Sequence, residues 1–256
     1  MATIHDAVPF AYPAHDARKA ASQQGPIRRS AGEAAAIITD SAFSAAEIER
    51  RLGVPGERIV TIPLGVGPPF GPGPVGAHPG YILVVGSDEP HKNVSTLVAG
   101  ARIALDGRET MLWGLGPTLP TGGPFRPLPP VDEEALVALY RGALFLAAPA
   151  LYEGFGLPLL EAMACGTPVL ASRAGPYPEV CGDACAWVDP PDDPHAWAEA
   201  LRELLDDPVR RSDLRERGLR RAAEFTWERT AAATLAVLRA HAQAGAAREP
   251  ASAAHN

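Results

Sequence analysis

The sequence predicts an α/β fold whose strands form a parallel sheet covered by helices on both faces. From residue 81 onward, short apolar runs alternate with helical segments. These runs lack the polar alternation of a strand that has one face in water. A Gly- and Pro-rich stretch at residues 65–80 separates this pattern from a shorter α/β segment before it. Two regions of unequal size are therefore expected.

Composition supports a folded chain and excludes several function classes. The 256 residues suffice for one large or two small domains, and 46% hydrophobic residues can form a core. The net charge of −7 argues against nucleic-acid binding by bulk charge. No apolar run approaches the roughly 20 residues of a membrane span, and the start lacks a signal-peptide pattern. We expect a cytoplasmic protein, and leave peripheral attachment to a membrane open.

The three cysteines do not form the pattern of a disulfide framework or a metal site. Cys165, Cys181 and Cys185 are an odd number in a large chain. The spacing of the last two is wrong for a common zinc site, and no second Cys/His pair lies nearby in the sequence. We therefore expect buried, reduced thiols and no metal.

The elements before the linker follow from local signals. Ser41 or Ser44 can cap a helix that Gly53 and Pro55 stop. Residues 14–32 are polar and basic and have only weak helical periodicity. The expected elements are a strand over 34–39, a helix over 45–52 and a strand over 58–63.

The elements after the linker alternate regularly. The expected strands are 81–86, 110–113, 144–148, 168–171 and 186–188, and the expected helices are 93–105, 132–142, 158–165, 194–205, 208–225 and 227–242. Ligands of parallel sheets bind beyond the carboxyl ends of the strands. The loops 86–93 and 149–156, each of which leaves a strand, are therefore the places to look for chemistry.

The most informative segment is EGFGLPLLEAMACGTP, residues 153–168, which reads as a loop entering a helix with Pro158 in its first turn. Free amides at Gly156 and Leu157, together with the helix dipole, would form a phosphate site. Glu161, one turn inside, would repel a phosphate and is expected to face neutral hydroxyls such as a ribose diol. Glu153 could reach a different hydroxylated group. The alternative makes Glu161 a helix-terminal charge and Glu153 a solvated loop acid.

Lys92 is the second candidate, in the loop 86–93. Lys19 and Lys92 are the chain's only lysines, and a lysine at this loop could neutralise a diphosphate as a point charge. The alternative, a solvated lysine at a helix start, is disfavoured by the helix dipole. The neighbouring His91 is interpreted as a bystander.

The block 153–168 resembles the E-x7-E signature of family 4 retaining glycosyltransferases (glycosyl transferases group 1), which have the GT-B fold. Segments similar to other parts of that family follow one another in the right order: 4–6, 41–44, 81–93, 139–143, 178–180 and 225–230. The resemblance implies two Rossmann-like domains, with the nucleotide sugar bound mainly to the second. It thus implies a Rossmann-like donor-binding domain and an incomplete second Rossmann-like domain.

The resemblance also implies residue roles. Glu161 would hold the ribose, Lys92 would face the diphosphate, and Glu153 with the following amides would face the donor sugar. His5 matches a histidine that reaches across the family's interdomain cleft. The implied catalytic residues are Glu153, His5 and Lys92, and the implied donor-binding residues are Lys92, Gly86, Ser87, Gly154, Phe155, Gly156, Leu157 and Glu161. No metal or resident cofactor is implied, because the nucleotide sugar is a co-substrate.

Three departures from the family pattern stand out. The chain begins where the family's N-terminal domain is more than half complete, so residues 1–66 are expected to be a remnant of it. Ser87 stands where the family commonly has a basic residue. Residues 114–132 are Gly- and Pro-rich where the family has another helix and strand, so a smaller sheet or an unpaired edge is expected. The remaining boundaries are a linker at 67–80, a nucleotide-sugar-binding domain with terminal helices at 81–243, and a disordered tail at 244–256.

The expected function is transfer of a hexosyl unit from a nucleotide diphosphate sugar to an unidentified acceptor with retention. One alternative is a non-catalytic nucleotide-sugar-binding module, or the donor half of a two-chain enzyme whose partner chain supplies the missing N-terminal domain. Another GT-B enzyme, such as a nucleotide-sugar epimerase, fits the 153–168 block less well.

Overall fold

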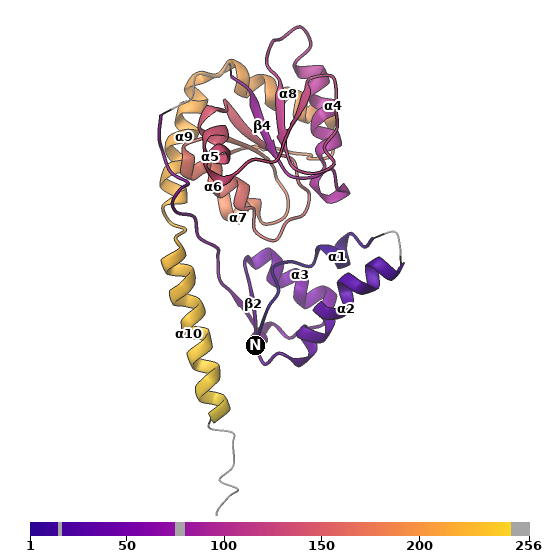
Figure 1. Cartoon of the computed structure of the whole chain (residues 1–256), viewed down its shortest axis with the longest axis vertical. Coiled ribbons are helices and arrows are strands. Elements are labelled where there is room, and N and C mark those ends of the chain that lie inside the picture. The colour runs from indigo at the N-terminus through magenta and orange to yellow at the C-terminus, as the bar shows by residue number, and fades with distance from the viewer. Residues whose placement is uncertain (15–16, 75–79, 247–256) are drawn as a thin grey trace, which may run out of the picture. The chain divides into compact units, whose positions relative to one another are not determined.

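The computed structural model describes residues 1–14, 17–74 and 80–246, which fall into two compact units (Figure 1). The first unit comprises Met1–Gly65 and the C-terminal segment from Trp227, and the second comprises Val66–Thr226. The last helix therefore groups with the first unit, whereas the sequence analysis placed it with the donor-binding domain. Within the expected linker, residues 67–74 and 80 carry no helix or strand, and residues 75–79 lie outside the described residues.

The second unit is built on a six-stranded sheet in which every pair of neighbours is parallel, in the order β6-β5-β4-β7-β8-β9. Its strands are β4 (Ile82–Val85), β5 (Leu112–Leu115), β6 (Phe125–Leu128), β7 (Phe145–Ala148), β8 (Val169–Ser172) and β9 (Cys185–Val188). The strand order runs outward in opposite directions from β4 and β7, so the topological switch point of the sheet lies between these two strands.

Helices cover this sheet and provide its core. They are η2 (Pro90–Lys92), α4 (Val94–Ala104), α5 (Glu133–Gly142), α6 (Leu157–Cys165), α7 (Tyr177–Cys181), α8 (Pro194–Asp206) and α9 (Pro208–Ala222). Helices α4 and α8 pack closely side by side (Figure 1), and a Cβ at Gly100 would lie 2.6 Å from the Cβ of Trp197. Fully buried strand residues such as Ile82, Leu112 and Phe145 pack with Leu97 in the same cluster.

Strand β6 corrects the expectation that residues 114–132 leave a smaller sheet or an unpaired edge. It pairs with β5 in the register Leu112↔Phe125 and Gly114↔Pro127. The N–H of Leu112 donates to the carbonyl of Pro124 at 2.8 Å. Because successive residues of a strand point to alternate edges, the nitrogen of Pro127 faces the outer edge of the sheet. The proline costs no ladder hydrogen bond there, which explains how a Pro-containing segment forms a strand.

The first unit has a three-stranded parallel sheet in the order β1-β2-β3. Its elements are β1 (Ala2–Thr3), α1 (Val8–Ala11), α2 (Ala17–Glu33), β2 (Ile37–Thr39), α3 (Ala42–Leu52), η1 (Gly56–Arg58), β3 (Ile59–Thr61) and α10 (Trp227–Ala246). The predicted caps of α3 are confirmed: Ser41 Oγ accepts from the N–H of Ser44 at 3.0 Å, and Gly53 ends the helix with φ +66°. Helix α10 includes the first three residues of the expected tail, whose other residues lie outside those described.

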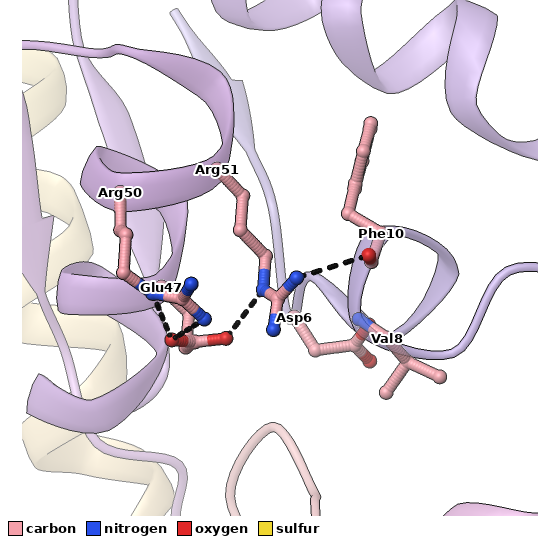
Figure 2. Close-up of polar contacts among 6 residues, drawn as sticks. All are labelled: Asp6, Val8, Phe10, Glu47, Arg50 and Arg51. Atoms are coloured by element: carbon pink, nitrogen blue, oxygen red, sulfur yellow. Dashed lines mark hydrogen bonds and ion pairs between the residues drawn. The ribbon is translucent and has the colours of Figure 1, made fainter.

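Arg51, held by a buried carboxylate of the same helix, connects α3 to α1 (Figure 2). Glu47 accepts hydrogen bonds from Arg50 Nη2 at 2.6 Å and from Arg51 Nε at 2.5 Å. Arg51 also donates through Nη1 to the carbonyl of Phe10 at 3.0 Å. Asp6 accepts from the N–H of Val8 at 2.9 Å, which fixes the start of α1. These bonds hold the segment that follows β1, where His5 and Asp6 lie.

None of the helices in the described part of the chain combines the length and the apolar character that crossing a bilayer requires.

Candidate functional site

Two loops meet at the switch point of the six-stranded sheet. The loop after β4 leads through η2 to α4, and the loop after β7 leads to α6. The N–H of Leu151 in the second loop donates to the carbonyl of His91 in the first at 2.8 Å. Beside them, Gly116 has φ +147°, and a Cβ there would lie only 1.7 Å from the carbonyl oxygen of Gly86. The structure thus brings together the loops 86–93 and 149–156, at which the sequence predicts ligand binding.

An ion pair joins the two loops. Lys92 Nζ lies 2.6 Å from Glu153 Oε1, and the hydroxyl of Tyr177 lies 3.5 Å from the same oxygen. The side chains of Lys92 and Glu153 are only 23% and 19% exposed, respectively. Neither is therefore the solvated surface charge of the alternative interpretation. Lys92 is held at the amino-terminal side of α4 by a carboxylate, which offsets the unfavourable helix dipole.

The ion pair borders a small hollow at the carboxyl ends of β4 and β7. The hollow holds about 10 Å³, which is room for roughly one water molecule. Its polar wall consists of Lys92 and Glu153, and Gly86, Pro158 and Tyr177 also line it. In this structure the hollow is therefore too small for a phosphate group.

The start of α6 supplies backbone donors at the same place. Gly156 is the N-cap with φ +105° and makes no side-chain capping bond. A Cβ at this position would lie 2.8 Å from the ring of Tyr177, so the close packing and the positive φ both require glycine. Within the first helical turn, Pro158 has no N–H and the N–H of Leu159 donates to the carbonyl of Gly156 at 3.1 Å, so the amides of Gly156 and Leu157 are the ones placed to bind an anion. Phe155 is buried with its ring edge-on to Phe225, so only its backbone could contact a ligand.

Glu161 lies in a different environment. Its Oε2 accepts from the hydroxyl of Tyr140 at 2.8 Å, and Tyr140 is fully buried with its ring edge-on to Phe70. Burial raises the pKa of Glu161, and the hydrogen bond from Tyr140 partly counteracts this rise. The residues described as lining the hollow include Glu153 but not Glu161. The two acids of the motif therefore do not share this hollow.

The residues described next lie in two places, the loop that leads from β4 to α4 and the first unit. Gly86 lines the hollow, and Ser87 donates to Glu89 Oε2 at 2.9 Å in the same loop. His91 is buried, and its interpretation as a bystander stays a prediction. His5 belongs to the first unit, where its Nδ1 lies 2.8 Å from Asp40 Oδ2, and its approach to a donor sugar stays a prediction.

Three residues that contact predicted site residues were missed. Tyr177 contacts Glu153, Tyr140 contacts Glu161, and Asp40 contacts His5. The segments 139–143 and 178–180, which carry the family resemblance, contain or adjoin the two tyrosines. The resemblance of these segments could have identified both tyrosines as candidates, although an aromatic residue in such a segment is more readily interpreted as part of the hydrophobic core.

The thiols and acids of the described residues show no metal site. Cys165, Cys181 and Cys185 are buried and free. Across residues 1–14, 17–74 and 80–246, no group of three or more His, Cys, Asp or Glu side chains could hold a metal ion.

Sequence comparison gives a family model and close relatives. The model described as "Glycosyl transferases group 1" matches residues 126–221. O-antigen chain mannosyltransferase B of Escherichia coli is 34% identical over 262 residues, which cover 92% of this chain and 68% of that protein. MMP alpha-(1->4)-mannosyltransferase of Mycolicibacterium hassiacum is 37% identical over 82% of this chain. The chain spans only 55% of that second relative's length.

Solved structures agree on the fold. Sucrose-phosphate synthase of Thermosynechococcus elongatus matches with a TM-score of 0.78 at 24% identity, covering 94% of this chain and 67% of that one. Anabaena HepE in complex with UDP and glucose matches with a TM-score of 0.76 at 16% identity, covering 93% of this chain and 71% of that one. The parallel six-stranded sheet and its mixed α/β layers are those of the GT-B fold.

Proposed function

Because the chain belongs to the group 1 glycosyltransferases, we propose that it transfers a hexosyl unit from a nucleotide diphosphate sugar to an acceptor, with retention of configuration. The single observation that carries this proposal is the Lys92–Glu153 ion pair in front of the first turn of α6. A cation, a carboxylate and the backbone N–H groups of Gly156 and Leu157 lie near the carboxyl ends of two adjacent parallel strands.

The cation and the backbone donors suit a leaving diphosphate. Negative charge grows on the diphosphate as the bond to the sugar breaks. A lysine has three N–H donors, so Lys92 can turn toward a phosphate while one donor stays on Glu153. The amides of Gly156 and Leu157 would add fixed positive dipoles at the start of α6. Stabilisation of this charge, with positioning of the reactants, is the proposed source of catalysis.

The two acids suit neutral hydroxyl groups on either side of the diphosphate. Glu153 would accept from hydroxyls of the donor sugar through the oxygen that Lys92 does not hold. Glu161, oriented by Tyr140, would accept from the ribose hydroxyls. Glu153 is not proposed as a nucleophile, because in this scheme the acceptor oxygen itself attacks the sugar. The acceptor oxygen would attack on the face from which the diphosphate departs, and a phosphate oxygen would take its proton. No metal or resident cofactor takes part in this scheme.

The test begins with thermal unfolding of the chain in the presence of UDP-, GDP- and ADP-sugars. A mannose donor belongs in the panel, since two relatives are named mannosyltransferases. A sugar nucleotide that raises the melting temperature is then assayed for hydrolysis and transfer, and the anomeric configuration of the product is determined by NMR.

Stabilisation with turnover and retained configuration supports the proposal. Stabilisation without turnover supports the binding module instead, and inversion contradicts the retaining mechanism. Lys92→Met, compared with Lys19→Met, checks that any stabilisation arises at the proposed site.

A further inference from the structure

A histidine and a buried aspartate form a pair in the first unit. His5 follows β1 and Asp40 follows β2, and these strands are parallel neighbours, so both residues lie at the same end of the sheet. His5 Nδ1 lies 2.8 Å from Asp40 Oδ2. The His5 side chain is 65% exposed, whereas that of Asp40 is 5% exposed. A buried carboxylate thus holds one nitrogen of an exposed imidazole.

The pair dictates which nitrogen carries the hydrogen. An ionised carboxylate can only accept hydrogen bonds, so Nδ1 of His5 must donate. Burial raises the pKa of Asp40 above its ordinary value of 3.8, and the hydrogen bond from His5 limits this rise. In the neutral imidazole, Nε2 is then left without a hydrogen and acts as an acceptor.

His5 lines a hollow of about 300 Å³ that lies within the first unit. The carboxyl end of β1 contributes Thr3, His5 and Asp6, and α2 contributes Ile27 and Ser30. Hydroxyl, carboxylate and imidazole groups therefore share the wall with an aliphatic side chain. This mixture suits a polyol, whose hydroxyls need polar partners while its C–H groups contact apolar surface.

We infer that Asp40 is a positioning residue that holds His5 in the Nδ1-protonated tautomer, so that Nε2 accepts a hydrogen bond from a hydroxyl of a polyol bound in this hollow. The inference rests on the proposed function only for the source of that hydroxyl, which would be a sugar substrate. The tautomer itself follows from the contact between His5 and Asp40.

The tautomer can be measured without any substrate. Long-range 15N–1H NMR spectra of the 15N-labelled full chain at pH 8 distinguish a protonated from an unprotonated ring nitrogen, and loss of signals in His5→Gln assigns them. We expect His5 to be protonated at Nδ1 in the wild-type chain. We expect Asp40→Asn to convert at least half of the population to the Nε2-protonated form, and the matched Asp6→Asn variant to leave it unchanged. A wild-type His5 that is protonated at Nε2 overturns the inference, even if Asp40→Asn fails to fold.

A double-mutant cycle tests the role in binding or turnover. With the sugar nucleotide that the chain turns over, Asp40→Asn and His5→Gln should each lower kcat/KM roughly tenfold, the size expected for one lost hydrogen bond. The double variant should be no worse than His5→Gln alone, because Asp40 acts through His5. Additive losses contradict the inference. If no sugar nucleotide is turned over, the proposed function fails, and the tautomer measurement still decides about Asp40.

Discussion

Glu153 and Glu161 lie eight residues apart in one motif, yet the fold gives them opposite electrostatic environments. Each contacts the hydroxyl of a buried tyrosine, at 3.5 Å for Glu153 with Tyr177 and at 2.8 Å for Glu161 with Tyr140. Only Glu153 also has a cation, Lys92, at 2.6 Å. Burial without a cation raises the pKa of Glu161. The two carboxylates are therefore suited to different partners, in line with the different places that the sequence gives them, one on a loop and one inside a helix.

The position of each acid explains the difference. Glu153 lies on the loop after β7, where the neighbouring loop after β4 can present Lys92. Glu161 lies inside α6, which packs against α5, and its neighbour from that helix is the phenol of Tyr140. A carboxylate with a phenol partner can accept from neutral hydroxyls without first breaking an ion pair. Four variants test this comparison, in order of decreasing expected effect.

Lys92→Met should have the largest effect. It removes the cation proposed to stabilise the leaving diphosphate, and turnover of the sugar nucleotide should fall by about 10²- to 10³-fold. It also leaves Glu153 without its ion-pair partner, so the melting temperature should fall. Steady-state kinetics and thermal unfolding measure the two effects. Lys19→Met, at the chain's other lysine, is the control and should retain wild-type turnover.

Glu153→Gln should lower turnover by roughly 10-fold, because a neutral amide accepts more weakly from the hydroxyls of the donor sugar. Affinity for the free nucleoside diphosphate, which lacks that sugar, should change little. Steady-state kinetics measures the turnover, and isothermal titration compares the affinity for the sugar nucleotide with that for the free nucleoside diphosphate. An equal loss of affinity for both ligands would argue against a role at the sugar.

Glu161→Gln should weaken binding of the free nucleoside diphosphate by about threefold to tenfold, the cost of weakening a charged hydrogen bond to the ribose. The same change should stabilise the chain at neutral pH. The folded state binds the Glu161 proton more tightly than the unfolded state, because the pKa is raised above its ordinary value of 4.5. Stability therefore falls as the pH rises through this range, and the loss is complete above the raised pKa.

The expected stabilisation by Glu161→Gln is measured by thermal unfolding at several pH values. Glu161→Gln should melt about 2 °C above the wild-type chain at pH 7, and this gap should close near pH 4. Glu134→Gln, at an exposed acid on α5, is the matched control and should show no such gap. A gap of constant size at all pH values would assign the effect to something other than ionisation.

Tyr140→Phe should have the smallest effect on binding. It removes a hydrogen bond that lowers the pKa of Glu161, so that pKa should rise further. Affinity for the nucleoside diphosphate should fall about twofold to threefold, and the fall should be larger at pH 6 than at pH 8. Tyr177→Phe should change affinity less, since its contact with Glu153 is long. Isothermal titration of both variants with the nucleoside diphosphate at pH 6 and at pH 8 measures these losses of affinity.

Much of the fold could be predicted because its signals are local. The cap at Ser41 and the stop at Gly53 each involve neighbours in the sequence, and the structure has both. Strand β6 was missed because Pro127 counts against a strand unless its place at the edge of the sheet is known. Helix α7 was missed because it is only five residues long and begins Tyr-Pro.

The site was predicted in its charged residues and missed in its partners. Lys92 and Glu153 were singled out separately, and their direct bond spans 61 residues of sequence. Tyr177 and Asp40 are placed by packing of strands and helices that no local pattern specifies. A pattern can therefore name the groups that bear charge, but only the fold shows which groups hold them in place.

The outermost strand of the larger sheet, β6, bears on edge-to-edge pairing between copies of the protein. The backbone groups of two β6 residues, Phe125 and Pro127, face the outer edge of the sheet. The N–H of Phe125 already donates to the carbonyl of Gly122 at 3.4 Å in a tight turn, and Pro127 has no N–H to donate. A strand from another copy could find carbonyl acceptors there but no available amide from these two residues. The N–H donors that a strand from another copy would need are thus taken or missing at these two residues, which disfavours edge-to-edge pairing at this rim.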